Sequence, residues 1–232
     1  MEIEEIRKWH KVFKPNNELF EIRVLGDRTY SAYFHDIEKA IVAMQPYDKY
    51  QIYFTVNEVK AACSGRTQYD RFECVSGSAT SKNDIEKRDW LPIDIDVERP
   101  SKVSASNEEK EYAHKKAASV YNFLKEANFP DPIVCDSSSG YHLYYPVEMD
   151  SSKEVETAIK DFFGVLSDHF TDSRVKVDKA VADSNRIMRL YGTWGRKGRN
   201  SKDRPHRLSK IIKIPNIEGR MSYEDLLLFI DK

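Results

Sequence analysis

The stretch Trp90-Leu-Pro-Ile-Asp-Ile-Asp-Val97 has the composition of a buried β-strand, but two acids interrupt it. Residues two apart in a strand point to the same face, so Asp94 and Asp96 should project side by side. Two carboxylates this close repel each other, and burying them without a counter-charge is unfavourable. A cation between them would relieve both costs, and oxygen ligands of this kind suit Mg²⁺ or Mn²⁺. The opposite face of the strand should contact the core through Ile93, Ile95 and Val97.

A second interpretation of the same strand requires no metal. The two acids could end the strand in solvent, or they could pair with Arg88 or Arg99, which flank the strand. Both settings are common for an isolated pair of acids, so the choice between them depends on the rest of the chain.

The bulk composition is that of an ordinary folded domain. The chain has 232 residues, of which 40% are hydrophobic and 12% aromatic, so it can bury a substantial core as one domain or two small lobes. Charged residues make up 32%, yet the net charge is only −1. Overall charge therefore predicts no partner, and a preference for polyanions would have to come from a local cluster.

The cysteines and the apolar segments indicate the compartment. Cys63, Cys74 and Cys135 are few, odd in number and contain no C-x-x-C pair. This pattern favours a reducing compartment and argues against a disulfide framework or a structural zinc site. No apolar run approaches the length of a membrane span, and the first residues do not resemble a signal peptide. We therefore expect a cytoplasmic protein with no zinc and no membrane partner.

The alternation of predicted strands and helices favours a mixed α/β domain. Strands are expected at residues 20–25, 51–56, 90–97, 133–135, 142–147, 175–177 and 211–214. Helices are expected at 2–13, from the cap Asp36 to Met44, at 107–127, at 152–170, and from the cap Ser222 to about Ile230. The polar stretch 61–88 is expected to be irregular, and no low-complexity linker divides the chain.

A loop of small residues joins two of the predicted strands in the stretch Asp136-Ser-Ser-Ser-Gly-Tyr-His142. Such a loop can direct backbone N–H groups at an anion, and a histidine that enters the next strand can donate to a phosphate oxygen. The simpler interpretation is a hairpin turn followed by a structural histidine. Taken alone, the loop favours this simpler interpretation.

A third acid, Asp178, follows the short predicted strand Val175-Lys-Val177. Alone, it is most simply a helix cap or a surface residue. Beside Asp94 and Asp96 it would complete a set of three carboxylates, and two-metal phosphoryl transfer uses such acids to hold two ions about 4 Å apart. Without metal, we expect the three carboxylates to raise one another's pKa values.

The strongest local charge lies in residues 186–210, which contain nine Lys or Arg residues and one acid. Aromatic residues and glycines are interleaved with the charges, which is typical of a surface for a nucleoside triphosphate or a nucleic-acid backbone. Tyr191 or Trp194 could stack on a base. The alternative is a solvated basic loop. Arg186 and Arg189, however, follow the third acid closely enough to reach the same site.

Together and in this order, these features resemble the archaeo-eukaryotic primase superfamily, in particular the primase-polymerase (prim-pol) domains of phage, plasmid and mobile-element replication proteins. The resemblance covers roughly residues 18–212. It rests on 53–57, on 91–96 with Arg99-Pro100 and the helix start at 104–108, on Ser139-Gly-Tyr-His142, on Val177-Asp178, and on 185–193 with Lys197-Gly198 and 204–207. The run of three serines departs from the Gly- or Asn-rich turn of many relatives, which leaves open which hydroxyl would meet phosphate.

The resemblance implies an α/β (α+β) fold in which an RRM-like sheet packs against a second α/β module. It implies one prim-pol catalytic domain over residues 1–232, with a helical extension at 1–17, a core at 18–212 and a C-terminal helix at 213–232. It also implies that Asp94, Asp96 and Asp178 are catalytic and hold two Mg²⁺ or Mn²⁺ ions. The implied nucleotide-binding residues are Ser139, Gly140, His142, Arg186, Arg189 and Lys197.

The implied function is that of a template-dependent nucleotidyltransferase that synthesises primers from NTP or dNTP and extends them on single-stranded DNA. A helicase domain or protein is a possible further partner. A repair or end-joining polymerase that extends primer-template DNA without initiating would share the acidic strand, the loop with its histidine, and the third acid. A non-catalytic replication-initiator module would use the basic segment and dispense with the acids. A metal-dependent nuclease would need no triphosphate pocket.

Overall fold

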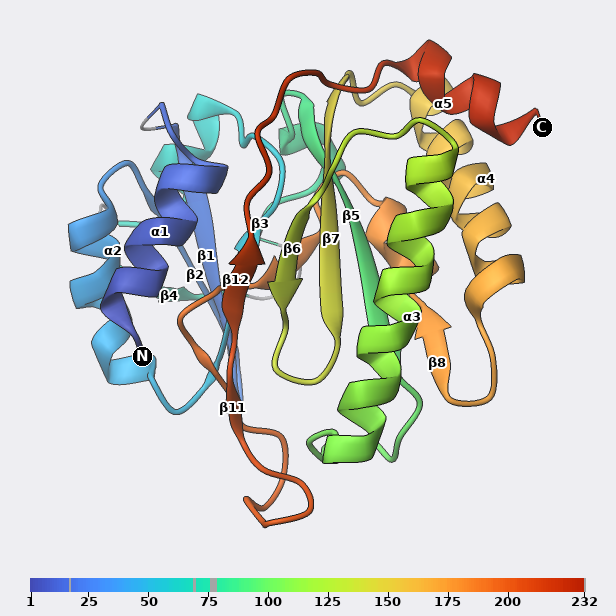
Figure 1. The fold of residues 1–232 in the computed structure, drawn as a ribbon. Helices are drawn as coiled ribbons and strands as arrows, with labels where there is room; N and C mark the ends of the chain where they lie inside the picture. The colour runs from blue at the N-terminus through green and yellow to red at the C-terminus, as the bar shows by residue number, and fades with distance from the viewer. Residues whose placement is uncertain (17, 69, 76–78, 232) are drawn as a thin grey trace.

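Two five-stranded antiparallel sheets form the framework of the computed structural model, which describes residues 1–16, 18–68, 70–75 and 79–231 (Figure 1). The first sheet has the order β4-β2-β1-β3-β9, with β1 (Phe20–Leu25), β2 (Thr29–Phe34), β3 (Gln51–Thr55), β4 (Glu73–Cys74) and β9 (Ile187–Arg189). The second has the order β12-β6-β7-β5-β8, with β5 (Arg88–Val97), β6 (Ile133–Asp136), β7 (Tyr141–Met149), β8 (Val175–Val177) and β12 (Lys210–Lys213). A small ribbon pairs β10 (Trp194–Gly195) with β11 (Arg207–Leu208).

Helices lie beside both sheets (Figure 1). The helices near the first sheet are α1 (Ile3–Phe13) and α2 (Ile37–Met44), and those near the second are α3 (Asn107–Glu126), α4 (Lys153–Phe170) and α5 (Tyr223–Ile230). Short 3₁₀ helices are η1 (Gln45–Tyr47), η2 (Ala61–Arg66), η3 (Lys82–Asp84) and η4 (Lys179–Ala182). None of the helices in the described ranges combines the length and the apolar character that a membrane span needs.

Side chains cap the starts of most α-helices. Asp36 accepts hydrogen bonds from two backbone N–H groups at the start of α2, and Ser222 forms a capping box with Asp225 at the start of α5. Ser106 forms a capping box with Glu109 at the start of α3, and the Ser152 side chain accepts from the Val155 N–H at the start of α4. These bonds satisfy N–H groups that have no partner within a helix, so the helix starts predicted at Asp36 and Ser222 are confirmed.

Strand β5 divides its side chains between two environments, as its alternation predicts. Ile93 and Ile95 are fully buried, on the face that α3 contacts. The opposite face begins with Trp90, whose ring lies 5.3 Å from that of Phe13 on α1. The same face ends with Asp94 and Asp96, which are partly exposed. One strand therefore joins the aromatic core to a polar cleft.

Helix α1 ties the two sheets together. The ring of Phe13 lies 5.4 Å from Phe54 on β3 and 4.8 Å from Tyr144 on β7. The carboxylate of Glu5 accepts a hydrogen bond from the Ile211 N–H on β12 at 2.6 Å. Because β12 is an edge strand, this bond satisfies a backbone group that pairing within the sheet leaves open.

Asn57, just after β3, connects the first sheet to the start of β5. Its amide oxygen accepts hydrogen bonds from the N–H groups of Asp89 and Trp90, each at 3.1 Å, and its amide nitrogen donates to the Ser184 carbonyl at 3.0 Å. The side chain is 1% exposed, so water cannot replace these bonds if the amide is removed.

Replacing Asn57 by alanine is expected to lower the free energy of unfolding by about 3 kcal/mol, because two buried N–H groups lose their acceptor. Asn122 is exposed in the C-terminal part of α3, and its replacement by alanine is expected to be neutral or slightly stabilising. Urea unfolding monitored by circular dichroism measures both variants. Equal stabilities of the two would contradict the role of Asn57 as a connector.

The elements that the sequence did not indicate are one strand of six residues and several very short strands. Strand β2 was not predicted, and neither were β9, β10 and β11, which have two or three residues each. The stretch predicted to be irregular contains η2, β4 and η3, and β5 begins two residues earlier than expected. Strand β9 pairs Arg189 with Tyr53, a contact for which nearby residues carry no signal.

Candidate active site

The pairing of β5 with β8 brings the three predicted acids together. Ile95 pairs with Val177 across the two strands, so Asp178, the next residue, lies opposite Asp94. The Asp178 N–H donates to the Asp94 carbonyl at 3.2 Å. Asp96 projects from β5 on the same face as Asp94. All three side chains line one cleft of about 260 Å³.

This cleft contains eight of the nine predicted site residues. They are Asp94, Asp96, Ser139, His142, Asp178, Arg186, Arg189 and Lys197. Gly140 is buried behind the wall, where its Cα approaches the Ile95 carbonyl oxygen. Tyr53, Ser137 and Ser138 also line the cleft and were not predicted as site residues. The sequence signals for Tyr53 were its place on the polar face of an alternating strand and its position in the stretch 53–57 that carries part of the resemblance.

Asp94 and Asp178 each face a nitrogen-bearing side chain. Asp94 Oδ1 lies 3.4 Å from His142 Nε2, and Asp178 Oδ2 accepts a hydrogen bond from Arg186 Nη2 at 2.6 Å. The other oxygen of Asp178 caps η4 by accepting from the Ala180 N–H. Asp178 therefore has both the local role of a helix cap and a place in the cleft.

Asp96 pairs with an arginine that flanks the strand. Arg99 Nη1 donates to Asp96 Oδ1 at 2.6 Å, and the Arg99 side chain is 6% exposed. The alternative partner, Arg88, instead donates to the Ala182 carbonyl at 3.0 Å. The ion-pair interpretation of the strand is thus correct for Asp96 with Arg99 and wrong for Arg88.

The pKa of Asp94 is lowered, so the expectation that the acids raise one another's pKa values is wrong for this residue. Burial alone would raise the pKa, but the interaction with the neighbouring imidazole of His142 and the charges of Arg186 and Lys197 outweigh it. The cleft therefore favours the ionised carboxylate, which is the form that binds a cation.

The serine loop is a tight hairpin turn between β6 and β7, in which Asp136 pairs with Tyr141. The Ser137 N–H donates to the Gly140 carbonyl at 3.1 Å, the Ser138 N–H to Asp136 Oδ1 at 2.7 Å, and the Gly140 N–H to Ser137 Oγ at 3.0 Å. Backbone N–H groups of the turn are therefore largely used inside it, contrary to the predicted anion nest. Ser137 Oγ accepts one of these bonds and Ser138 is buried, whereas the Ser139 hydroxyl makes no hydrogen bond to any described residue.

The ammonium of Lys110 on α3 binds both ends of this turn. It donates to Asp136 Oδ1 at 2.5 Å and to the Gly140 carbonyl at 2.7 Å, and it lies 3.9 Å from the centre of the Tyr141 ring. Burial lowers the pKa of Lys110, and the Asp136 carboxylate opposes that shift. The sequence offered no signal for this lysine, because its neighbours on the helix are mostly charged as well.

Three of the nine cations in residues 186–210, among them Arg186 with Asp178, form ion pairs within the protein. Arg196 pairs with Asp48 at 3.2 Å and Arg204 with Glu109 at 2.7 Å. Within the described part of the chain, the other six cations of the segment have no ion-pair partner: Arg189, Lys197, Arg199, Lys202, Arg207 and Lys210. The sequence charge of this segment therefore overstates the positive surface that it presents.

One of the two aromatic residues proposed to stack on a base is unavailable for that role. Tyr191 is 0% exposed, and its hydroxyl lies 2.6 Å from His142 Nδ1. Stacking by Tyr191 is therefore excluded because a base could not reach the ring. Trp194 is half-buried, and Arg196 lies 6.0 Å from its ring centre.

The donor set of the cleft fits a hard divalent cation. Asp94 and Asp96 present oxygen ligands from adjacent positions of one face, and Asp178 adds a third carboxylate from the neighbouring strand. Arg99 and Arg186 currently pair with two of these acids, so a bound cation would have to share or replace them. Lys197 lies in the cleft with no hydrogen bond from its ammonium to any described residue.

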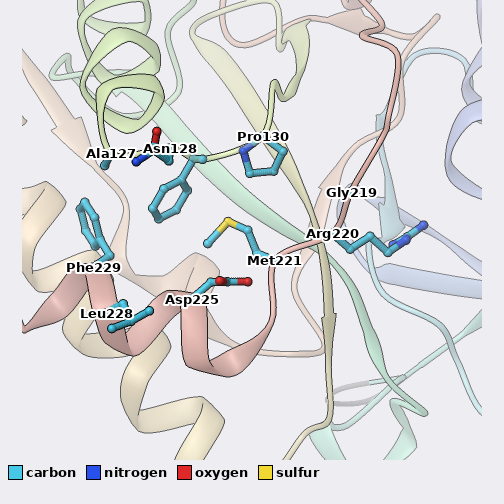
Figure 2. Close-up of a pocket in the computed structure, with 10 residues that line it drawn as sticks. Ala127, Asn128, Pro130, Gly219, Arg220, Met221, Asp225, Leu228 and Phe229 are labelled. Carbon is cyan, nitrogen blue, oxygen red and sulfur yellow. The ribbon is translucent and has the colours of Figure 1, made fainter.

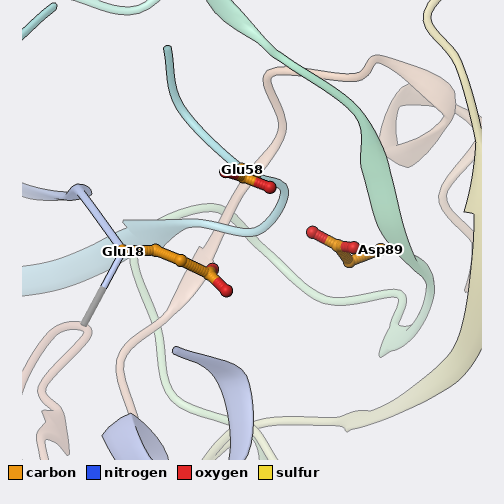
Figure 3. A group of neighbouring side chains, drawn as sticks. All are labelled: Glu18, Glu58 and Asp89. Carbon is orange, nitrogen blue, oxygen red and sulfur yellow. The ribbon is translucent and has the colours of Figure 1, made fainter. Parts of the chain in front are cut away.

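A tighter acidic cluster lies at the other end of β5. The carboxylates of Glu18, Glu58 and Asp89 approach one another within 4.8 Å, the only described group that meets this spacing (Figure 3). Lys87 lies 3.2 Å from Asp89 and 3.4 Å from Glu58, and the charge of buried Lys14 also acts on all three acids. Protein cations thus already balance this cluster.

A larger cavity of about 390 Å³ lies against α5. Figure 2 shows Met221 and Phe229 at its wall, with Asp225 and Arg220 as its charged residues. Asp225 is committed to the capping box of α5. The cavity therefore lacks the converging carboxylates and cations of the smaller cleft between the sheets.

Comparisons with known proteins agree with this fold. No family model matches the sequence, and no curated protein matches it. The AEP domain of cyanophage S-2L primase-polymerase (PrimPol) is similar in structure, with a TM-score of 0.58 and 10% identity over 98% of this chain and 97% of that chain. Primase RepB′ is also similar, with a TM-score of 0.50 and 12% identity over 99% of this chain and 62% of that chain.

Proposed function

On the fold of the archaeo-eukaryotic primase-polymerases, which this chain adopts, we propose a template-dependent nucleotidyltransferase that synthesises and extends primers on single-stranded DNA. The observation that carries the proposal is the convergence of Asp94, Asp96 and Asp178 in one cleft with His142 and Lys197. Carboxylates that can hold metal ions, with an imidazole and an ammonium that can offset phosphate charge, suit phosphoryl transfer from a nucleoside triphosphate.

The three acids would hold Mg²⁺ or Mn²⁺ through their carboxylate oxygens. Such ions lower the pKa of an attacking 3′-hydroxyl and stabilise charge on the leaving pyrophosphate. The lowered pKa of Asp94 favours the ionised carboxylate, which is the form that binds a cation. Arg99 and Arg186 restrict the rotamers of Asp96 and Asp178, which reduces the conformational entropy lost when a ligand binds.

The remaining polar groups of the cleft would bind the triphosphate. His142 Nε2 faces the cleft beside Asp94, where it can donate to a phosphate oxygen. Lys197 also lines the cleft, and neither its ammonium nor the buried Nη1 of Arg189 has a hydrogen-bond partner among the described residues. The Ser139 hydroxyl adds a neutral donor. These groups offset phosphate charge by position and electrostatics alone.

The decisive experiment omits the primer. The protein is incubated with circular single-stranded DNA, Mg²⁺ or Mn²⁺, and labelled NTP or dNTP, and the products are separated by size. The expected result is new strands in the absence of primer, and the labelled sugar that is incorporated defines the substrate. Extension only from an added primer would indicate a repair or end-joining polymerase instead. DNA binding without synthesis would indicate an initiator module, and degradation without nucleotide a nuclease.

A further inference from the structure

A buried hydrogen-bonded group lies directly behind His142. Tyr144 of β7 and Tyr191, which follows β9, are both 0% exposed, and His142 is 4% exposed. Tyr191 Oη lies 2.6 Å from His142 Nδ1 and 2.8 Å from Tyr144 Oη, and Tyr144 Oη lies 3.3 Å from the same imidazole nitrogen. Since water does not reach these atoms, they must satisfy one another's hydrogen-bonding capacity.

Counting hydrogens gives the direction of the bonds. Burial raises the pKa of both phenols well above the usual value, so each hydroxyl keeps its hydrogen. If Tyr144 donates to Tyr191 and Tyr191 donates to His142 Nδ1, every hydroxyl hydrogen has an acceptor. The Cys135 thiol also neighbours Tyr191, but sulfur is a weak partner that cannot replace the imidazole nitrogen.

The opposite direction leaves two groups poorly placed. With hydrogen on Nδ1 of a neutral imidazole, Nδ1 would donate to Tyr191, and Tyr191 would donate to the Tyr144 hydroxyl. The hydroxyl hydrogen of Tyr144 would then have no oxygen or nitrogen acceptor among the described residues. The lone pair on Nε2 would also face the Asp94 carboxylate oxygen at 3.4 Å. Both ends of the ring therefore favour hydrogen on Nε2.

We propose that Tyr191 and Tyr144 are positioning residues that hold the imidazole of His142 with its Nε2–H directed into the cleft. The inference rests on the proposed function for the ligand that this N–H meets, a phosphate oxygen of the incoming nucleotide. The tyrosines contact no substrate themselves. They set the tautomer and orientation of the histidine, as outer hydrogen-bond partners do for metal-bound histidines.

Replacing Tyr191 by phenylalanine tests this role and preserves the packing of the ring. The chain offers a matched control in Tyr145, which lies on the same strand as His142, is 1% exposed, and has a hydroxyl without a hydrogen-bond partner among the described residues. Tyr145→Phe removes the same atom from an equally buried site on the opposite face of β7. A Tyr144→Phe variant provides a second route if Tyr191→Phe does not fold.

The first readout is the ¹⁵N spectrum of the imidazoles in metal-free protein at about pH 8, where an ordinary histidine is neutral. Signals of His142 are assigned with a His142→Gln variant. The wild type and Tyr145→Phe should show a protonated Nε2 and an unprotonated, hydrogen-bonded Nδ1. Tyr191→Phe should shift the Nδ1 signal towards that of a free imidazole or show a mixture of tautomers. An unchanged spectrum in Tyr191→Phe would overturn the proposal.

The second readout is the dissociation constant for a nucleoside triphosphate. Tyr191→Phe should weaken binding by about tenfold, as expected for one misplaced hydrogen bond, while the rate at saturating nucleotide changes less. Equal weakening in Tyr145→Phe would also overturn the proposal, because general loosening of the core would then explain the effect. If the wild type binds no nucleotide but its spectrum shows the predicted tautomer, the proposed function fails while the positioning of His142 stands.

Discussion

Replacing Asp94 by asparagine is expected to slow nucleotide incorporation by about 10³-fold, since loss of a metal-binding charge removes several kcal/mol of stabilisation from the transition state. The variant keeps the shape of the side chain, and an amide can still contact His142. The fold and DNA binding should therefore remain nearly intact. Single-turnover primer extension measures the rate, and circular dichroism with a DNA gel-shift assay measures the two properties expected to persist.

Asp89 is the matched control for this prediction. It lies on the same strand, is an acid of similar exposure, and belongs to the cluster with Glu18 and Glu58 at the other end of β5 (Figure 3). Asp89→Asn is expected to keep the incorporation rate within about threefold of the wild type. A large loss of incorporation rate in Asp89→Asn, with activity retained in Asp94→Asn, would indicate that the metal site is the cluster of Glu18, Glu58 and Asp89.

Replacing Gly140 by alanine is expected to weaken nucleotide binding by at least about tenfold and to lower the free energy of unfolding by about 1–3 kcal/mol. A β-carbon at this position would overlap the carbonyl oxygen of Ile95, which is backbone in the second sheet. Either the serine turn or β5 must move. Since Ile95 lies between Asp94 and Asp96, either movement separates the turn from the two acids.

Gly164 provides the opposite case. It lies inside α4, where an added β-carbon would meet no atom within 4 Å, so Gly164→Ala is expected to stabilise the protein by up to about 1 kcal/mol. Thermal unfolding should show a lower stability for Gly140→Ala and a higher stability for Gly164→Ala. Nucleotide titration should show weaker binding for Gly140→Ala alone. Wild-type nucleotide affinity in Gly140→Ala would show that the turn does not contribute to the site.

Some local features of the site follow from nearby residues. The alternation in residues 90–97 placed Asp94 and Asp96 on one face because strand geometry alone sets that periodicity. The turn at Ser137–Gly140 and the helix starts at Asp36 and Ser222 were likewise visible, since small residues and capping side chains act on backbone groups within a few positions. The fold class also followed, through the order of the motifs and their resemblance to primase-polymerases.

Other features depend on contacts between distant segments. Lys110 lies 26 positions from Asp136, and β9 pairs with β3 across more than a hundred residues. Tyr191 looked like an exposed aromatic of a basic loop, but packing buried it behind His142. Two cations of the basic segment, Arg196 and Arg204, are paired with Asp48 and Glu109, which lie far away in the chain.

The sequence by itself determined the chemistry that each segment can supply: two carboxylates on a strand, a turn that ends near a histidine, a third acid and a set of cations. These depend on residue type and on local backbone period. Only the tertiary structure decided which of them meet, because antiparallel pairing of β5 with β7 and β8 places His142 and Asp178 opposite Asp94. Register is set by burial and hydrogen bonding over the whole sheet, and no single stretch of the chain encodes it.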